Sequence, residues 1–185
     1  MPDKIKGPLV LTVICTVISA LLIFVHEKTY VDTTGIITDD LKAGLEEIYG
    51  EGEYTMLRSP DGNVLKYDGV DSVIVKDDGS TAFEVTADGY ARNGIHVLVG
   101  VNEDGITGIS FIDLAETPGV GTRIRDDKKF IKQFTGISDE SFSPDVLTGA
   151  TLSSKGMKRA ADSALNAYTL YRNETEEGGT ADEQP

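Results

Sequence analysis

The chain has few of the residues that bind metals through sulfur or imidazole. It contains one cysteine, Cys15, and two histidines, His26 and His96. Because an iron–sulfur cluster needs about four thiolates, the chain cannot build one alone. A CxxCH haem-attachment motif and an internal disulfide are also excluded, and no metal site is predicted. If the protein has a redox function, its cofactor is expected to be organic.

Basic residues are scarce as well. Seventeen Lys and Arg stand against 31 Asp and Glu, so that the formal net charge is −14. Such a surface repels nucleic-acid phosphates, and nucleic-acid binding is not expected. Tryptophan is absent, but six Phe and seven Tyr, with 39% apolar residues overall, are sufficient for the core of one globular domain.

One long uncharged run lies near the N-terminus, PLVLTVICTVISALLIFV at residues 8–25. As a helix it would be about 27 Å long, close to the hydrocarbon thickness of a bilayer. Lys4 and Lys6 precede it, and the positive-inside rule then predicts a cytoplasmic N-terminus and a main domain outside the cytoplasm. A cleaved signal peptide is the alternative, although the run is long for one and no A-x-A-like cleavage site follows.

Small polar residues mark one face of this predicted transmembrane helix. Thr12, Thr16 and Ser19 share the face, and Cys15 lies beside them. Two interpretations remain open. The hydroxyl groups bond the backbone of their own helix, or the face packs closely against a partner membrane subunit.

The rest of the chain predicts an α+β fold, in which an antiparallel β-meander sheet packs with helices. Asp-Gly pairs recur between residues 61 and 105 and separate short runs rich in β-branched residues. The runs expected to form strands are NVLKY, SVIVK, TAFEVTA, GIHVLVGV and ITGISFI. His96 lies in the fourth run, where it is expected to be half exposed.

Three helices are predicted around this sheet. The first covers residues 38–50, with Thr38 as its N-terminal cap. The second covers residues 126–136, after a loop at residues 115–124 that is punctuated by Pro and Gly. The third runs from about residue 153 to residue 172, and its apolar stripe consists of Met157, Ala160, Ala161, Ala164, Leu165, Tyr168 and Tyr171.

The predicted organisation has four parts. Residues 1–7 form a short cytoplasmic N-terminus, and residues 8–25 form the transmembrane helix. Residues 26–172 form the extracytoplasmic domain. The remaining residues, 173–185, carry five acids and no base and are predicted to be a disordered tail.

The stretch DVLTGATLSS, residues 145–154, precedes the last predicted helix. On its local pattern, Thr151 or Ser153 caps that helix. The same place is also suited to an anion, because a helix N-terminus offers unpaired N–H groups and about half a positive charge. Gly149 and Ala150 are small enough for a phosphate to approach the backbone, and Thr151 would place a hydroxyl group there.

This stretch resembles the Asp-x-x-(Ser/Thr)-Gly-Ala-(Thr/Ser) signature of proteins that carry covalently attached FMN. AETPGVG, upstream at residues 115–121, is similar to the second signature of that family, Glu-Thr-Pro-Gly-Leu-Gly, with Val120 in place of Leu. FIKQFTG and the strand sequences before it also look like the family, so the resemblance covers about residues 83–172. It implies that a flavin transferase joins the FMN phosphate to Thr151 as a phosphodiester.

The resemblance also implies a set of site residues. The cofactor-binding residues are expected to be Thr151, Thr148, Gly149, Ala150, Leu152, Ser153, Glu116, Thr117 and Gly119. Asp145 is expected to serve recognition by the transferase, and His96 is a further candidate for contact with the flavin. No catalytic residue is assigned.

The family includes the RnfG and NqrC subunits of ion-pumping membrane complexes. The resemblance, with the single anchor and compact length, implies an electron-carrier subunit of a membrane-bound, ion-translocating ferredoxin:NAD⁺ oxidoreductase, the Rnf complex. Its partners would be other membrane and redox subunits, and it would not be catalytic alone. The alternatives are an NqrC-like subunit of a Na⁺-translocating NADH:quinone oxidoreductase and an anchored, non-redox binding module.

Overall fold

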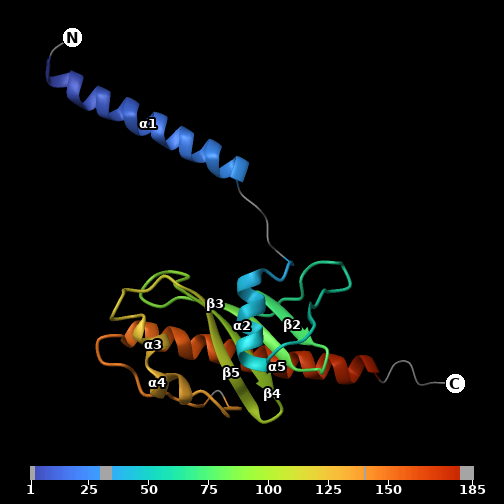
Figure 1. The fold of residues 1–185 in the computed structure, drawn as a ribbon. Helices are drawn as coiled ribbons and strands as arrows, with labels where there is room; N and C mark the ends of the chain where they lie inside the picture. The colour runs from blue at the N-terminus through green and yellow to red at the C-terminus, as the bar shows by residue number, and fades with distance from the viewer. Residues whose placement is uncertain (1–2, 30–34, 140, 180–185) are drawn as a thin grey trace. The chain divides into compact units, whose positions relative to one another are not determined.

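The computed structural model describes residues 3–29, 35–139 and 141–179 and divides the chain into two units, residues 1–34 and 35–185. The first unit contains helix α1, Asp3–Thr29 (Figure 1). The part of α1 from residue 7 onward is long and apolar enough to cross a membrane, as predicted.

The polar face of α1 uses its hydroxyl groups locally. Thr12 Oγ1 donates to the carbonyl oxygen of Pro8 at 2.9 Å, and Thr16 Oγ1 donates to that of Thr12 at 2.8 Å. This geometry agrees with the interpretation in which the threonines bond the backbone of their own helix.

The second unit is built on a five-stranded sheet in the order β1-β2-β3-β4-β5 (Figure 1). Each strand pairs antiparallel with the next along the chain, which confirms the predicted meander. Positive-φ glycines lie in the tight turns, such as Gly79 between β2 and β3 at φ 87° and Gly105 after β4 at φ 115°. The strands are β1 Tyr54–Met56, β2 Ser72–Lys76, β3 Thr81–Ala87, β4 Ile95–Asn102 and β5 Gly105–Leu114.

Two details of the sheet differ from the prediction. NVLKY, residues 63–67, forms only isolated bridges, because it is confined between two turns and folds back on the preceding residues. The N–H of Leu65 donates to the carbonyl oxygen of Leu57, and that of Ser59 donates to Asn63. Strand β1 was not predicted, since three residues are too few to establish an alternating pattern.

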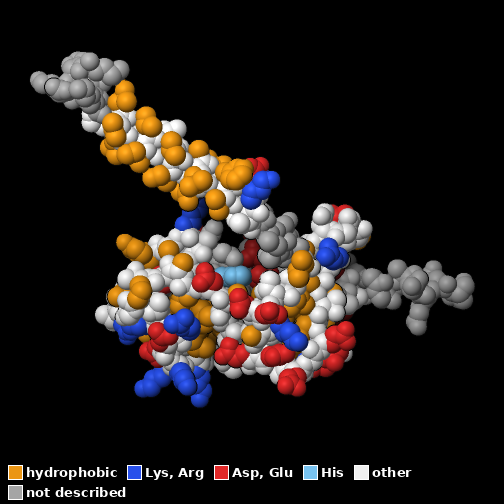
Figure 2. All heavy atoms as spheres, turned by 45° about the horizontal axis from the view of Figure 1, so that its top comes forward, with side chains coloured by type: hydrophobic (Ala, Val, Ile, Leu, Met, Phe, Trp, Pro, Cys, Tyr) orange, Lys and Arg blue, Asp and Glu red, His pale blue; other side chains and the backbone are white. Residues whose placement is uncertain are grey.

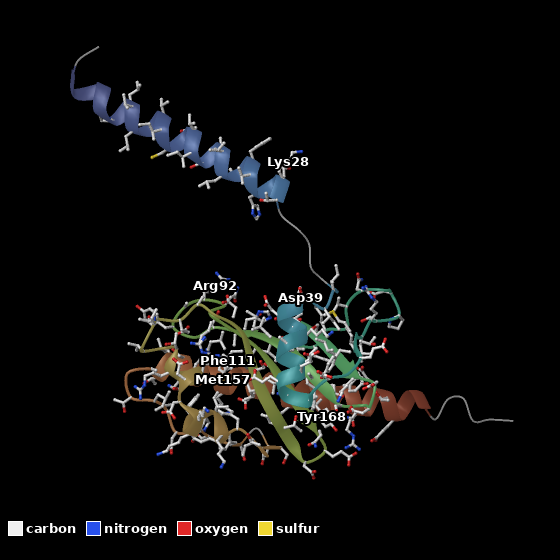
Figure 3. All side chains as sticks on the ribbon, viewed as in Figure 1. Lys28, Asp39, Arg92, Phe111, Met157 and Tyr168 are labelled. Atoms are coloured by element: carbon white, nitrogen blue, oxygen red, sulfur yellow. The ribbon has the colours of Figure 1, made fainter. Side chains whose placement is uncertain are left out.

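Helices cover both faces of the sheet. Helix α5, Thr151–Gly179, packs on one face together with α3, Arg123–Asp126, and α4, Lys128–Lys132, while α2, Asp39–Tyr49, packs on the other (Figure 1). Met157 and Tyr168 project from α5 (Figure 3). The α5 side holds the larger core, which includes Phe83, Val97, Val99, Phe130, Phe134 and Met157.

The first predicted helix is confirmed, and the second is divided. Helix α2 has Thr38 as its N-cap, whose Oγ1 accepts from the N–H of Leu41 at 3.3 Å. The region 126–136 contains the end of α3 and then α4, because Asp127 adopts an extended conformation. Its carboxyl group caps α4 by accepting from the N–H groups of Lys129 and Phe130.

The last helix is longer than predicted at its C-terminal end. Helix α5 continues to residue 179, so the first part of the tail predicted to be disordered is helical. Side chains one turn apart support this extension: Arg172 forms an ion pair with Glu176, and Thr175 donates to the carbonyl oxygen of Tyr171. Residues 180–185 of the predicted tail lie outside the described residues.

Candidate functional site

The N-terminus of α5 begins one residue earlier than the capping prediction requires. Gly149 has φ 85°, and the carbonyl oxygen of Ala150 accepts the first helical bond, from the N–H of Ser154 at 2.9 Å. Ala150 therefore occupies the N-cap position and Thr151 is the first helical residue. The prediction that Thr151 or Ser153 caps this helix is wrong.

Ser154 performs the stabilising role that the sequence suggested for its neighbours. Its fully buried Oγ donates to the carbonyl oxygen of Ala150 at 2.9 Å and accepts from the N–H of Leu147 at 3.1 Å. Since Ser154 stabilises the turn, the Thr151 side chain is not needed to cap the helix. The Thr151 side chain is exposed, and its hydroxyl group has no hydrogen-bond partner within the described parts of the chain.

The second motif forms a compact turn before α3. The N–H groups of Val120 and Gly121 both donate to the carbonyl oxygen of Thr117, at 3.1 and 2.9 Å. Gly119 lies at φ 73°, and its N–H donates to Oγ1 of Thr122 at 2.9 Å. The Pro-Gly punctuation of the sequence thus corresponds to a tight turn that is closed by several backbone hydrogen bonds.

Glu116 connects three segments of the chain. Its buried carboxyl group accepts from Ser153 Oγ in the first turn of α5 at 2.5 Å and from the N–H of Ala91 at 3.0 Å. A Cβ atom at Gly89, Gly94 or Gly121 would lie within 2.8 Å of a Glu116 carboxyl oxygen. The glycines therefore make room for the carboxyl group that holds the loop against the start of α5.

A cavity of about 430 Å³ lies where these segments meet. The two motifs, which residues 122–144 separate in the sequence, both contribute to its wall. The predicted site residues that line it are Glu116, Thr117, Gly149, Ala150, Thr151, Leu152 and Ser153, and they are joined by Tyr90, Val120 and Gly121.

Three predicted residues do not line the cavity. Gly119 shapes the loop, as described above. The carbonyl oxygen of Thr148 accepts from Nη1 of Arg123 at 3.0 Å, which connects the TGAT stretch to α3. Asp145 has an exposed side chain, and its N–H donates to Oε1 of Gln133 at 2.9 Å.

His96 lies on the α2 face of the sheet, away from the α5-side core. It is half exposed, as predicted, and its Nε2 lies 2.9 Å from Oε1 of Glu84. The hydrogen bond to Glu84 raises the pKa of His96 above its usual value, although burial opposes the shift. Since His96 does not line the cavity, its candidacy for contact with a ligand there is not supported.

Tyr90 is the cavity residue that sequence reasoning missed. It follows β3 in a loop and is 73% exposed, which is unusual for a large aromatic side chain. The available signal in the sequence was a tyrosine in a predicted Gly-containing turn, but only the fold brings this loop to the start of α5.

The comparison with protein families agrees with this geometry. Residues 89–166 match the family model of the FMN-binding domain. No curated protein and no solved structure matches the chain. The matched segment contains the Glu116–Gly121 loop and Thr151, so the two motifs that line the cavity lie within the part of the chain that is similar to an FMN-binding domain.

The cavity residues suit the similarity to an FMN-binding domain. The volume lies within the range of about 300–1,000 Å³ that small-molecule sites occupy. Tyr90, Val120 and Leu152 remain 73%, 42% and 53% exposed, so that apolar surface is available to a planar ring. The first turn of α5 contains no acid, and its unpaired N–H groups favour a phosphate.

Proposed function

We propose that Thr151 carries FMN through a phosphodiester bond and that the protein is an electron-carrier subunit of a membrane-bound Rnf complex. The observation that supports it best is the exposed, unbonded Thr151 hydroxyl group at the rim of the cavity. A hydroxyl group used for capping engages one oxygen lone pair with a backbone N–H, and this bond fixes the orientation of the side chain. Thr151 has no such bond to lose among the described residues.

The attachment step has a definite chemical balance. Thr151 Oγ1 attacks the phosphorus atom and forms the new P–O bond, and its proton passes to a base of the flavin transferase. Free FMN would have to expel water, so the donor is expected to be a flavin dinucleotide whose phosphoanhydride bond breaks. The second nucleotide then leaves. We assign Asp145 to recognition by the transferase, because its side chain is exposed and it lies four residues before Gly149, in the turn that precedes Thr151.

The bound flavin would supply reversible electron transfer. The chain supplies position: Glu116 holds the loop to α5, and the α5 N-terminus stabilises the phosphate. On this proposal the protein is not catalytic alone and works with other membrane redox subunits that couple electron flow to ion translocation. Its N-terminus lies in the cytoplasm, with the flavin domain on the opposite side of the cell membrane.

The test is co-expression of the full chain with a flavin transferase, followed by a denaturing gel viewed under ultraviolet light. Wild type and Thr151→Ser are expected to give a fluorescent band, because both retain a hydroxyl group. Thr151→Ala is expected to lose the band, whereas Thr148→Ala, a change at another exposed threonine of the same motif, is expected to keep it. No band from the wild type with an active transferase would refute covalent attachment.

Membership of the Rnf complex needs a separate experiment. The tagged full chain should co-purify from solubilised membranes with ferredoxin:NAD⁺ oxidoreductase activity. Co-purification with NADH:quinone oxidoreductase activity would instead assign it to the NqrC-like alternative. A protease-accessibility assay on intact cells tests the topology, which a domain protected on the cytoplasmic side would contradict.

A further inference from the structure

A basic cluster interrupts the otherwise acidic surface beside the cavity. Residues 123–132, which form α3 and α4, contain five Lys and Arg and two Asp, in a chain whose formal net charge is −14. Figure 2 shows Lys and Arg side chains gathered over this part of the domain, next to exposed hydrophobic atoms. A local positive field on an acidic protein attracts anionic partners selectively.

The cluster forms the rim of a groove along strand β5, which we call the β5 groove. The groove has a volume of about 390 Å³, with half-buried Ile109, Phe111 and Ile131 as its apolar floor. Arg125, Lys128 and Lys132 form the basic rim. Glu47 of α2 forms the opposite wall, and its carboxyl group accepts from Ser110 Oγ at 2.6 Å, so this acid is already engaged.

The strand beneath the groove is an edge of the sheet. β5 is last in the strand order, and its outer side is bonded near one end, where Ile106 exchanges backbone hydrogen bonds with residues 136–137 at 2.8 and 2.9 Å. Farther along β5, no strand within the described ranges pairs with this outer side. An open edge of this kind accepts an extended chain by strand addition.

We infer that the β5 groove binds an acidic, extended segment of a partner protein. The basic rim selects acidic side chains, the floor takes apolar side chains of the same segment, and the edge of β5 offers backbone hydrogen bonds. A flat, anionic lipid surface would meet the rim but leave the concave floor uncovered.

Helix α3 connects the groove to the TGAT stretch that lines the cavity. Arg125 lines the groove, and Arg123, on the same helix, donates to Thr148 next to the attachment residue. A docked partner would therefore be held beside the cavity. The inference itself does not depend on flavin attachment, because the groove is built from residues outside the cavity.

The test is photo-crosslinking of the full chain in the membranes of its own cells. The probe is Thr135→p-benzoylphenylalanine, since Thr135 is exposed and lines the groove; Asp61→p-benzoylphenylalanine, on an exposed turn, is the matched position outside it. We expect a protein adduct from residue 135 whose cross-linked peptide is rich in Asp and Glu. Lys128→Gln/Lys132→Gln should lower its yield by about fivefold or more, since each rim charge steers and holds the partner.

The matched charge control is Lys42→Gln/Lys66→Gln, which removes two charges from exposed lysines outside the groove and should leave the adduct unchanged. The thermal unfolding midpoint of each variant verifies folding, and the flavin fluorescence of each band reports attachment separately. An adduct to lipid only, to a second copy of this chain, or to a peptide without acids would overturn the inference. So would an adduct whose yield does not respond to the Lys128/Lys132 change, or no adduct at all.

Discussion

Helix α2 follows Thr38 and helix α5 begins with Thr151, but only the Thr38 hydroxyl group has a hydrogen-bond partner within the described parts of the chain. Thr38 Oγ1 accepts from the N–H of Leu41, and Asp39 and Asp40 place negative charge at the positive end of the helix. Helix α2 therefore stabilises its own N-terminus with local residues, as ordinary structural helices do.

The start of α5 is stabilised from other parts of the chain. Ala150 cannot cap by a side chain, Ser154 fixes the turn from inside the helix, and Glu116 holds Ser153 from a loop 37 residues away. The first turn contains no acid. The Thr38 hydroxyl group stabilises its helix by bonding to a backbone N–H. The Thr151 hydroxyl group is available for reaction because other residues stabilise the start of α5.

The largest effect is expected when the Thr151 hydroxyl group is removed without changing the side-chain shape. Thr151→Val should abolish the fluorescent flavin label, because no nucleophilic oxygen remains. The free energy of unfolding of the full chain in detergent should change by less than about 0.5 kcal/mol, since the hydroxyl group makes no intramolecular bond. Gel fluorescence measures the loss of the flavin label, and urea unfolding measures the free energy of unfolding. A large loss of stability would show that the Thr151 hydroxyl group does stabilise the helix start.

Removal of the carboxyl group that holds α5 should have the largest effect on stability. Glu116→Ala leaves the buried Ser153 Oγ and the part-buried N–H of Ala91 without their acceptor, at a cost of about 2–4 kcal/mol. Glu116→Gln, which keeps the volume and one acceptor oxygen, should cost less than half as much. Urea unfolding measures both, and equal costs would show that shape rather than hydrogen bonding is responsible.

Loss of the Thr38 cap should lower the stability and leave the flavin label unchanged, whereas loss of the Thr151 hydroxyl group should do the reverse. Thr38→Ala removes the acceptor of the Leu41 N–H and should lower the free energy of unfolding by about 1 kcal/mol. The flavin label should remain at the wild-type level, because α2 lies on the other face of the sheet. A reduced label at constant folded fraction would mean that the two helix starts are coupled.

The smallest expected effect is a pH dependence of the free energy of unfolding. It should arise from His96 on the α2 face of the sheet. The hydrogen bond to Glu84 raises the pKa of His96 above 6.5, so the folded chain favours the charged imidazole. This stabilisation is fully present below pH 6.5 and is lost as the pH rises through the raised pKa. Relative to His96→Gln, the wild type should lose up to about 1 kcal/mol of unfolding free energy over that rise.

Urea unfolding at a series of pH values measures this difference. Covalently attached flavin should stay constant across the same series, because His96 does not line the cavity. If the stability difference grew as the pH rose, the ion pair between His96 and Glu84 would not be what stabilises the folded state.

Much of the fold could be predicted because its signals are local. The alternating residues of β4 and the Asp-Gly turns indicated the meander, and the apolar stripe of α5 indicated a long helix. Errors arose where nonlocal contacts decide. β1 is too short to have an alternating pattern of its own. The NVLKY stretch forms backbone hydrogen bonds with residues 57–59 instead of joining the sheet.

The sequence indicated the separate segments of the candidate site but not that they lie together. The resemblance indicated the Glu116 loop and Thr151 separately, and only the fold places both on one cavity with Tyr90. A buried glutamate also contradicts the usual preference of acids for the surface. Its burial depends on Gly89 and Gly94 of another loop, on Gly121 of its own loop, and on donors that no local pattern predicts.

By itself the sequence determined the apolar N-terminal segment, the α+β class with its antiparallel meander, and the threonine of the flavin signature. These properties depend on composition, short-range periodicity and a contiguous motif. Only the tertiary structure decided that Ala150 rather than Thr151 caps α5, that Glu116 joins the loop to the helix, and that the β5 edge lies open beside a basic rim. Each depends on hydrogen bonds, close contacts or charges from segments far apart in the chain, which become neighbours only after the sheet has formed.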